Sequence, residues 1–132
     1  MKGTCLCESV VIEASDVSDF EACHCGMCRR WGGGPFLGVH CKGNIVISGE
    51  EFVGRYASSE WAARGFCSQC GTHLFYHLKP TDEYVLPLGL FQDAGEFMFK
   101  QQIFIDKKPD YYAFANSTET LTEQQVFAQY GE

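Results

Sequence analysis

The sequence predicts a mainly β domain with one short helix near the C-terminus, and three observations support this. Turn-forming residues interrupt the chain about every ten positions, a spacing typical of all-β domains. The segments between the turns are short and rich in β-branched and aromatic residues, the latter making up 14% of the chain. Hydrophobic residues make up 45% of the 132 residues, which is enough to fill one core, so we expect a single domain over residues 1–132.

Several segments are expected to be strands because they combine β-forming residues with flanking turn signals. A turn at Lys42-Gly43 separates two of them, and the apolar residues of the last one alternate imperfectly, which indicates one core-facing side. The expected strands are Val10–Ile12, Phe36–His40, Asn44–Ser48, Phe52–Ala57, His73–His77, Tyr84–Leu88 and Phe97–Ile105.

The expected helix covers about residues 122–130. Thr122 followed by Gln125 fits a capping box, and Val126, Phe127 and Tyr130 form an apolar stripe at helical spacing. We therefore expect this helix to pack on a sheet. The glycines at 32–34 lack the Lys-Ser/Thr of a phosphate-binding loop and are expected to form a flexible turn.

Charge and hydropathy exclude two classes of partner. The formal net charge is −7 and no basic patch is visible, which argues against nucleic acid and against an anionic membrane surface. The N-terminal residues lack the apolar stretch of a secretion signal, and no window approaches the ~20 apolar residues of a membrane span. We therefore expect a cytoplasmic protein whose thiols stay reduced.

The cysteines carry the strongest chemical signal. Tight clusters are typical of zinc sites, because a tetrahedral zinc needs ligands about 2.3 Å from the ion and nearby thiolates can turn onto it together. A glycine after Cys-x-x-Cys permits positive φ and lets backbone N–H groups face the sulfurs. Seven of the eight cysteines form three such clusters: Cys5 and Cys7; Cys23, Cys25 and Cys28; and Cys67 and Cys70, which Gly71 follows.

Seven ligands divide most naturally into four and three. The second cluster can supply three thiolates to one ion by itself. Cys5 and Cys7 would then share an ion with Cys67 and Cys70. A different grouping of the clusters would use the same residues and stays open. A four-thiolate zinc is closed and structural, whereas a three-thiolate zinc keeps one position for water, a substrate or another side chain.

Other interpretations of the cysteines are weaker. Disulfides are disfavoured by the reducing compartment, and a redox-active Cys-x-x-Cys would be expected beside a βαβ pattern, which is not visible. The solitary Cys41 is expected to be a buried core thiol. The histidines, among them His24 between two ligands, are expected at the surface or supporting the ligands rather than binding metal.

The clusters and their surroundings, read together, resemble the glutathione-dependent formaldehyde-activating enzyme family, which includes the relatives of centromere protein V. The resemblance covers residues 3 to about 112, and the expected C-terminal helix lies outside it. The matching residues are Gly3-x-Cys5-x-Cys7, Cys23-His24-Cys25-x-x-Cys28-Arg29-Arg30, the glycines at 32–34, Tyr56-x-Ser58-Ser59, Arg64-Gly65-Phe66-Cys67-x-x-Cys70-Gly71-Thr72-x-Leu74-Phe75-Tyr76, Gly89-Leu90-Phe91-x-Asp93 and Lys108-Pro109-Asp110-Tyr111.

The resemblance implies an Mss4-like fold of several small twisted antiparallel sheets stapled by zinc. It implies a structural site at Cys5, Cys7, Cys67 and Cys70 and a catalytic site at Cys23, Cys25 and Cys28. The family's named reaction joins formaldehyde to glutathione. The chain departs from the family pattern at Glu8, where a glycine is common, at Gln92, which interrupts a Leu-Asp segment, and at Tyr111, where tryptophan is usual.

We therefore expect a zinc-dependent carbon–sulfur lyase or synthase that takes a small thiol such as glutathione. Arg29, Arg30 and Arg64 are candidates to bind the two carboxylates of glutathione, or else they pair with the acidic excess on the surface. Two other functions use the same sequence features: binding of glutathione adducts without catalysis, and a zinc-stapled interaction module in which both ions are structural.

Overall fold

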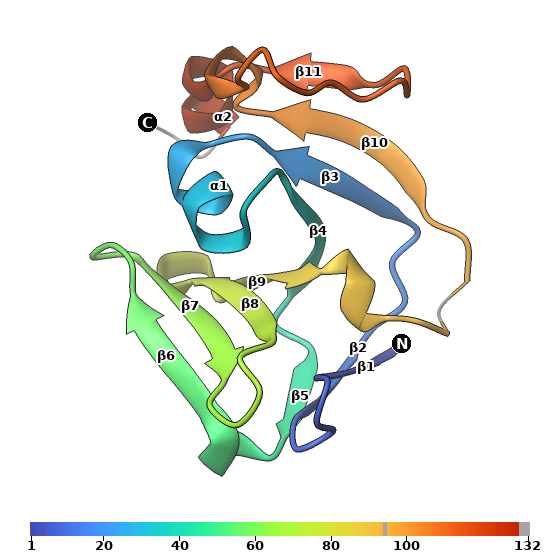
Figure 1. The fold of residues 1–132 in the computed structure, drawn as a ribbon, viewed down its shortest axis with the longest axis vertical. Helices are drawn as coiled ribbons and strands as arrows, with labels where there is room; N and C mark the ends of the chain where they lie inside the picture. Colours follow the sequence, from blue (N-terminus) through green and yellow to red (C-terminus); the bar gives the residue numbers. More distant parts are fainter. Residues whose placement is uncertain (94, 130–132) are drawn as a thin grey trace. The chain divides into compact units, whose positions relative to one another are not determined.

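The computed structural model describes residues 1–93 and 95–129 and divides the chain into two compact units. The first unit combines Met1–Ser18 with Val39–Glu96, and the second combines Asp19–Gly38 with Phe97–Glu132. Each unit is therefore assembled from two segments that lie far apart in the sequence (Figure 1). The single domain over residues 1–132 stays a prediction.

The first unit contains two antiparallel groups of strands. One has the order β1-β2-β5, and the other has the order β6-β7-β8-β9. β2 shows the expected alternation, since Ile12 and Ala14 are buried while Glu13 between them is exposed. The strands are β1 (Lys2–Thr4), β2 (Val11–Ala14), β5 (Ile45–Ser48), β6 (Val53–Ala57), β7 (Ala62–Cys67), β8 (His73–Leu78) and β9 (Glu83–Pro87).

β7 and β8 approach each other closely in the first unit, at a position where only glycine fits. Gly65 on β7 lies opposite Phe75 on β8, and the Phe75 side chain is fully buried. A Cβ at position 65 would lie 2.2 Å from a Phe75 ring carbon, so only glycine leaves room for the ring. Leu74 and Phe75 are both buried, because a register shift between β7 and β8 interrupts the usual alternation.

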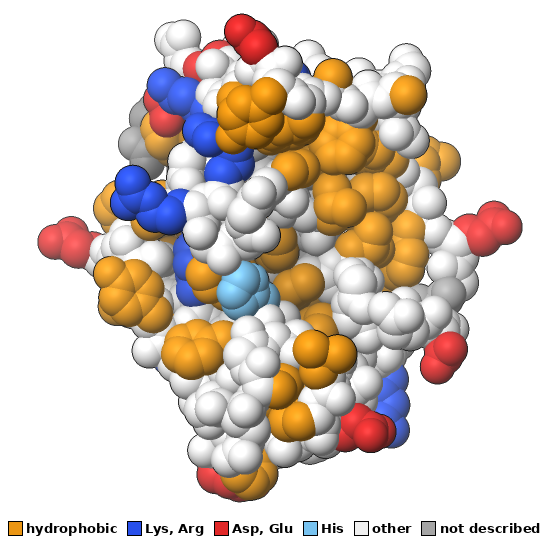
Figure 2. All heavy atoms as spheres, in the orientation of Figure 1, with side chains coloured by type: hydrophobic (Ala, Val, Ile, Leu, Met, Phe, Trp, Pro, Cys, Tyr) orange, Lys and Arg blue, Asp and Glu red, His pale blue; other side chains and the backbone are white. Residues whose placement is uncertain are grey.

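The second unit is built on strands in the order β11-β10-β3, followed by the first part of β4. Phe20 on β3 and Phe99 on β10 stack with ring centroids 4.8 Å apart, and hydrophobic side chains gather over these two strands in Figure 2. The elements are β3 (Asp19–Cys23), α1 (Gly26–Gly32), β4 (Phe36–Lys42), β10 (Met98–Ile103), β11 (Glu119–Leu121) and α2 (Glu123–Gln129). β4 continues from this unit into the first, with Val39 as the first residue counted there.

The mainly β class with several sheets and a short C-terminal helix is confirmed, with one difference in strand direction. The pairs β10–β3 and β10–β11 are parallel rather than antiparallel. A parallel pair needs a long connection between its strands. The whole of 39–96 lies between β3 and β10, and residues 104–118 join β10 to β11, so the chain supplies both.

Each of the seven expected strands is present with shifted ends, whereas four short strands and one helix were not expected. The prediction of a single helix is wrong, because α1 follows the second cysteine cluster. Its seven residues are too few to give a clear helical period, and the helix is capped by Cys25 at the N-terminus and by Gly33, with φ 86°, at the C-terminus. The glycines expected as a flexible turn therefore end this helix. The unexpected strands are β1, β3, β7 and β11.

The C-terminal helix is confirmed as Glu123–Gln129. The Thr122 backbone N–H donates to Gln125 Oε1 at 2.8 Å, and the Gln125 backbone N–H donates to Thr122 Oγ1 at 3.2 Å, which is the predicted capping box. Val126 is buried, and Phe127 packs on Phe104. The predicted apolar position Tyr130 lies outside the described residues. Neither helix in the described part of the chain has the length and apolar character needed to cross a membrane.

Replacement of Gly65 by alanine should destabilise the protein by about 1–3 kcal/mol, because the new methyl group overpacks against a ring that has no free space. Urea unfolding followed by circular dichroism measures this change. Gly89→Ala is the matched control, since nothing lies within 4 Å of the Cβ that would be added there. A Gly65→Ala variant as stable as Gly89→Ala would contradict the packing described here.

Candidate metal centres

The first cluster brings four thiols together inside the first unit. Cys5 and Cys7 lie in the loop after β1, Cys67 ends β7, and Cys70 lies in the turn before β8. All four Sγ atoms lie within 4.8 Å of one another. The Sγ atom of Cys7 is 3.7 Å from those of Cys5 and Cys67. Tetrahedral zinc with bonds of about 2.3 Å places its sulfurs about 3.8 Å apart, so this arrangement fits a zinc ion.

Backbone conformation and one hydroxyl group hold the two halves of this cluster in place. Gly71 has φ 80°, as expected for the residue after the Cys-x-x-Cys turn, and its N–H donates to the Cys67 carbonyl at 2.7 Å. Thr72 joins the two loops, because its Oγ1 accepts from the Leu6 N–H at 3.1 Å and lies 3.1 Å from Cys70 Sγ. The halves are therefore joined by a hydrogen-bonded threonine as well as by their thiols.

The electrostatics of the four thiols differ and together favour a bound cation. Hydrogen bonds from the hydroxyl and the backbone of Thr72 lower the pKa of Cys70 to about 5. Hydrogen bonding to Ser9 likewise lowers the pKa of Cys7. Burial raises the pKa of Cys67 to about 11, because a bare thiolate would be desolvated there. A divalent cation among the sulfurs would offset that cost, as in other thiolate metal sites.

The second cluster lies inside the second unit, where β3 meets α1. Cys23 is the last residue of β3, Cys25 caps α1, and Cys28 lies in its first turn. Their three Sγ atoms lie within 4.8 Å of one another. The Cys28 N–H donates to Cys25 Sγ at 3.3 Å, so the helix cap orients one candidate ligand. Hydrogen bonds with the Cys25 and Cys28 thiols, followed by burial, raise the pKa of Cys23.

No fourth His, Cys, Asp or Glu side chain among the described residues of the second unit joins this cluster. The division of the cysteines into four and three, with Cys5 and Cys7 beside Cys67 and Cys70, is therefore the one that the structure shows. Cys41 belongs to neither group and is buried, as expected. Three thiols within 4.8 Å of one another suit three of the four positions around a tetrahedral zinc.

His24 lies between two of these cysteines, and its ring points into the protein interior. It is fully buried, so a position at the surface was a wrong expectation. The Tyr112 hydroxyl lies 2.7 Å from Nδ1, and Gln102 Oε1 lies 2.8 Å from Nε2. Burial lowers the pKa of His24, and the charges of Lys108 and Arg29 lower it further. Both ring nitrogens therefore have hydrogen-bond partners in the protein and not a metal.

The three candidate arginines lie in different settings. Arg29 is half-buried in the last turn of α1, where its Nε donates to the His24 carbonyl at 3.0 Å. Arg30 in the same turn is exposed. Arg64 lies on β7 in the first unit, is only 5% exposed, and stands over the Tyr76 ring at 5.0 Å. Only Arg29 and Arg30 thus share a unit with the three-cysteine cluster.

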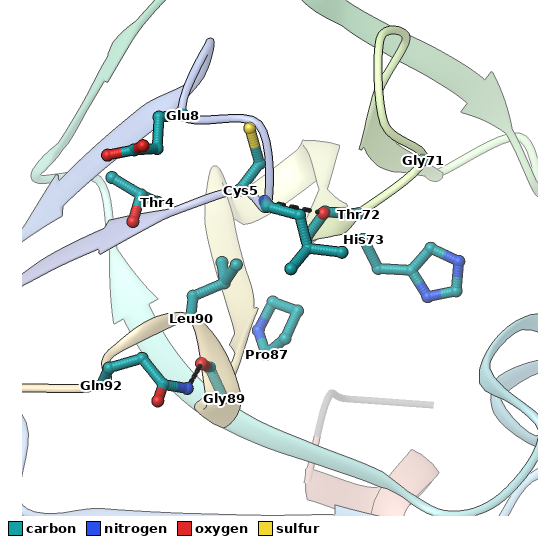
Figure 3. A pocket seen from close by; sticks show the side chains of 11 residues that line it. Thr4, Cys5, Glu8, Gly71, Thr72, His73, Pro87, Gly89, Leu90 and Gln92 are labelled. Carbon is teal, nitrogen blue, oxygen red and sulfur yellow. Dashed lines mark hydrogen bonds between the residues drawn. The ribbon is translucent and has the colours of Figure 1, made fainter.

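A cavity of about 670 Å³ beside the four-cysteine cluster was not expected from the sequence. Two residues at which the chain departs from the family pattern, Glu8 and Gln92, both line it (Figure 3). The Gln92 amide donates to the Gly89 carbonyl at 2.7 Å across the cavity wall. The other lining residues are Thr4, Cys5, Leu6, Gly71, Thr72, His73, Pro87, Gly89 and Leu90.

Glu8 has φ 65°, a conformation that favours glycine. A residue other than glycine in this left-handed conformation is destabilised by about 1–2 kcal/mol, which glycine would relieve. Glycine would in turn cost about 0.5–1 kcal/mol, because its unfolded chain has more conformational entropy to lose. We therefore expect Glu8→Gly to stabilise the protein by about 0.5–1 kcal/mol in thermal or urea unfolding. Glu8→Ala is the control, because it removes the carboxylate and keeps the strain. An equal gain in both variants would show that the charge, and not the backbone, is responsible.

Several known proteins are similar to this chain. The family profile described as "Glutathione-dependent formaldehyde-activating enzyme" matches residues 1–107. An uncharacterized lyase of Schizosaccharomyces pombe is 37% identical, covering 95% of this chain and 93% of that protein. A putative glutathione-dependent formaldehyde-activating enzyme of Halomonas elongata is 23% identical, covering 98% and 88%.

A crystal structure of a Rhodobacter sphaeroides protein superposes with a TM-score of 0.62 at 25% identity, covering 72% of this chain and 91% of that one. The fold is therefore one already seen in a solved protein. The profile match spans both cysteine clusters, and the yeast relative covers nearly the whole chain. The chain belongs to the glutathione-dependent formaldehyde-activating enzyme family.

Proposed function

We propose that the chain binds one zinc ion in each cysteine cluster and acts as a carbon–sulfur lyase or synthase of the S-(hydroxymethyl)glutathione synthase type. The observation that carries this proposal is the unequal number of thiols, four in one cluster and three in the other. Four thiolates close a tetrahedral zinc, whereas three leave a position for a ligand from solution. The names of the family and of the two relatives, which include a lyase, support the class of reaction.

The proposed roles of the two clusters differ. Cys5, Cys7, Cys67 and Cys70 would hold the structural ion, which ties the loop after β1 to the turn before β8. Cys23, Cys25 and Cys28 would hold the second ion in the catalytic site. Zinc bound there would supply a Lewis acid and stabilise a thiolate ligand.

The reaction that fits this site is the addition of a glutathione thiol to formaldehyde. The sulfur forms a bond to the aldehyde carbon, the carbonyl π bond breaks, and the thiol proton ends on the former carbonyl oxygen. The product is S-(hydroxymethyl)glutathione, and the reverse reaction is the cleavage of its carbon–sulfur bond.

The cytoplasmic location stays a prediction.

Positive charge near the second cluster would bind the carboxylates of glutathione. Arg29 and Arg30 extend from the last turn of α1, and Lys and Arg side chains gather on the side of Figure 2 where α1 and α2 lie. Lys107 and Lys108 belong to the same unit. The rest of the chain is acidic, with a net charge of −7 overall. An anionic substrate would therefore bind more favourably beside these lysines and arginines than elsewhere on the surface. Arg64 remains a predicted carboxylate ligand.

The test is the rate of S-(hydroxymethyl)glutathione formation, measured by exchange NMR with ¹³C-formaldehyde against the uncatalysed background. The zinc-loaded protein should raise the rate, and Cys28→Ser should lose the increase and the second zinc while keeping the fold. Cys41→Ser is the matched control, because Cys41 lies outside both clusters. Titration calorimetry with glutathione alone separates a catalyst from a binding protein. Binding without any rate increase would refute catalysis, and two zinc ions without binding would favour an interaction module.

Cys67→Ser should instead unfold the protein or lower its melting temperature by at least about 10 °C. A structural zinc contributes about 10–16 kcal/mol of apparent binding free energy in small zinc domains, and the variant would lose a large part of it. Differential scanning calorimetry and metal analysis of the same sample measure both effects. Unchanged melting with full zinc content would remove the structural role from this cluster.

A further inference from the structure

We propose that His24 is a positioning residue for the three-cysteine site, and that the Tyr112 hydroxyl holds its ring in place. This inference rests on the proposed second zinc ion. It concerns how the chain keeps Cys23 and Cys25 aimed at one point, since His24 lies between them in the sequence. The exposed fraction of His24 is 0%.

The side chain of His24 takes part in a continuous hydrogen-bonded chain. Gln102 Nε2 donates to Thr118 Oγ1 at 3.0 Å, which turns the Gln102 amide oxygen toward the histidine. That oxygen lies 2.8 Å from His24 Nε2 and accepts its hydrogen. In the neutral ring Nδ1 then has a lone pair, which accepts from the Tyr112 hydroxyl at 2.7 Å. One tautomer and one ring orientation satisfy every contact.

The backbone of His24 is held as well. Its N–H donates to the Ile103 carbonyl at 3.1 Å, and its carbonyl accepts from Arg29 Nε at 3.0 Å. The residue is thus bound through its ring and through both of its backbone groups. Each flanking cysteine is joined by one peptide bond to a residue whose position is fixed. This restrains the direction in which its Cα–Cβ bond points.

This arrangement explains why a buried histidine lies between two metal ligands without being one. Both ring nitrogens are used by Gln102 and Tyr112, which come from segments distant in the sequence. Partners outside the ligand shell of a metal typically change its affinity by about 10–100-fold when they are removed. The conformational entropy of the three thiols is lost when the protein folds. Metal binding is therefore opposed by a smaller further loss of entropy.

The test compares Tyr112→Phe with Tyr111→Phe in the full chain. The first variant keeps the ring, including its contact with Lys108 at 5.3 Å, and removes the one hydroxyl group that faces His24. The second removes the hydroxyl of the neighbouring tyrosine, whose side chain is 79% exposed. Zinc affinities of both clusters are measured by competition with a chromophoric chelator, and Co²⁺ substitution reports the geometry through the thiolate-to-cobalt absorption bands.

Tyr112→Phe should weaken the more weakly bound ion about tenfold or more and alter its cobalt spectrum, with the tighter ion unchanged. Tyr111→Phe should stay within about twofold of the unsubstituted chain for both ions. Gln102→Leu should act like Tyr112→Phe, and the double variant should lose less than the sum, because both residues act through one ring.

An unaltered second site in Tyr112→Phe, or equal weakening of both ions, would overturn the positioning role. The second outcome would mean that the hydroxyl supports general stability only. A chain that binds a single ion even without substitution would refute the proposed second zinc, and the role of His24 toward it would fall with that proposal.

Discussion

The spacing between sulfur atoms is the constraint on which the first unit depends. Two loops meet at this point, and Leu6 between Cys5 and Cys7 leaves 86% of its surface exposed. Burial of the Leu6 side chain therefore contributes little to joining them. What joins them is a group of thiols at the distance that a tetrahedral ion requires, together with the hydroxyl group of Thr72. If the proposed ion binds here, metal binding and folding of the first unit would be coupled, as they are in small zinc domains.

The three-cysteine cluster is built in a different way. Its thiols come from six consecutive residues, so the chain needs no distant segment to bring them together. The distant segments contribute hydrogen-bond partners instead, because Gln102 Oε1 accepts from the ring of His24 and the Tyr112 hydroxyl contacts its other nitrogen. If the second ion proposed above keeps one position open, no fourth protein ligand completes its geometry. The hydrogen bonds of His24 would then help to orient the ligands without occupying that position.

Two of the residues at which this chain is expected to depart from its family lie close together in the structure. Glu8 adopts a backbone conformation that glycine would adopt without strain, and it lines the same cavity as Gln92. The cavity lies in the first unit beside the four-cysteine cluster, so both of these residues belong to that part of the first unit.

The sequence by itself determined which residues form the candidate metal centres and the class of the fold. Cysteine spacing is a local property, and turn residues with β-forming segments between them act over a few residues, so both can be read without a structure. The C-terminal helix was also predictable, because its capping box involves residues three positions apart. The spacing predicted a division of the seven thiols into four and three but left open which cysteines share a group, since that depends on which loops meet in space.

Only the tertiary structure decided the remaining features. α1 is only seven residues long, too short for its apolar spacing to predict a helix, and it is capped by Cys25 and Gly33. β3 lies parallel to β10, which the long segment between them permits. The burial of His24 depends on Gln102 and Tyr112, which lie more than seventy residues further along the chain. Such contacts leave no periodic trace in a single sequence, because the free energy of a buried hydrogen bond depends on partners that only folding brings together.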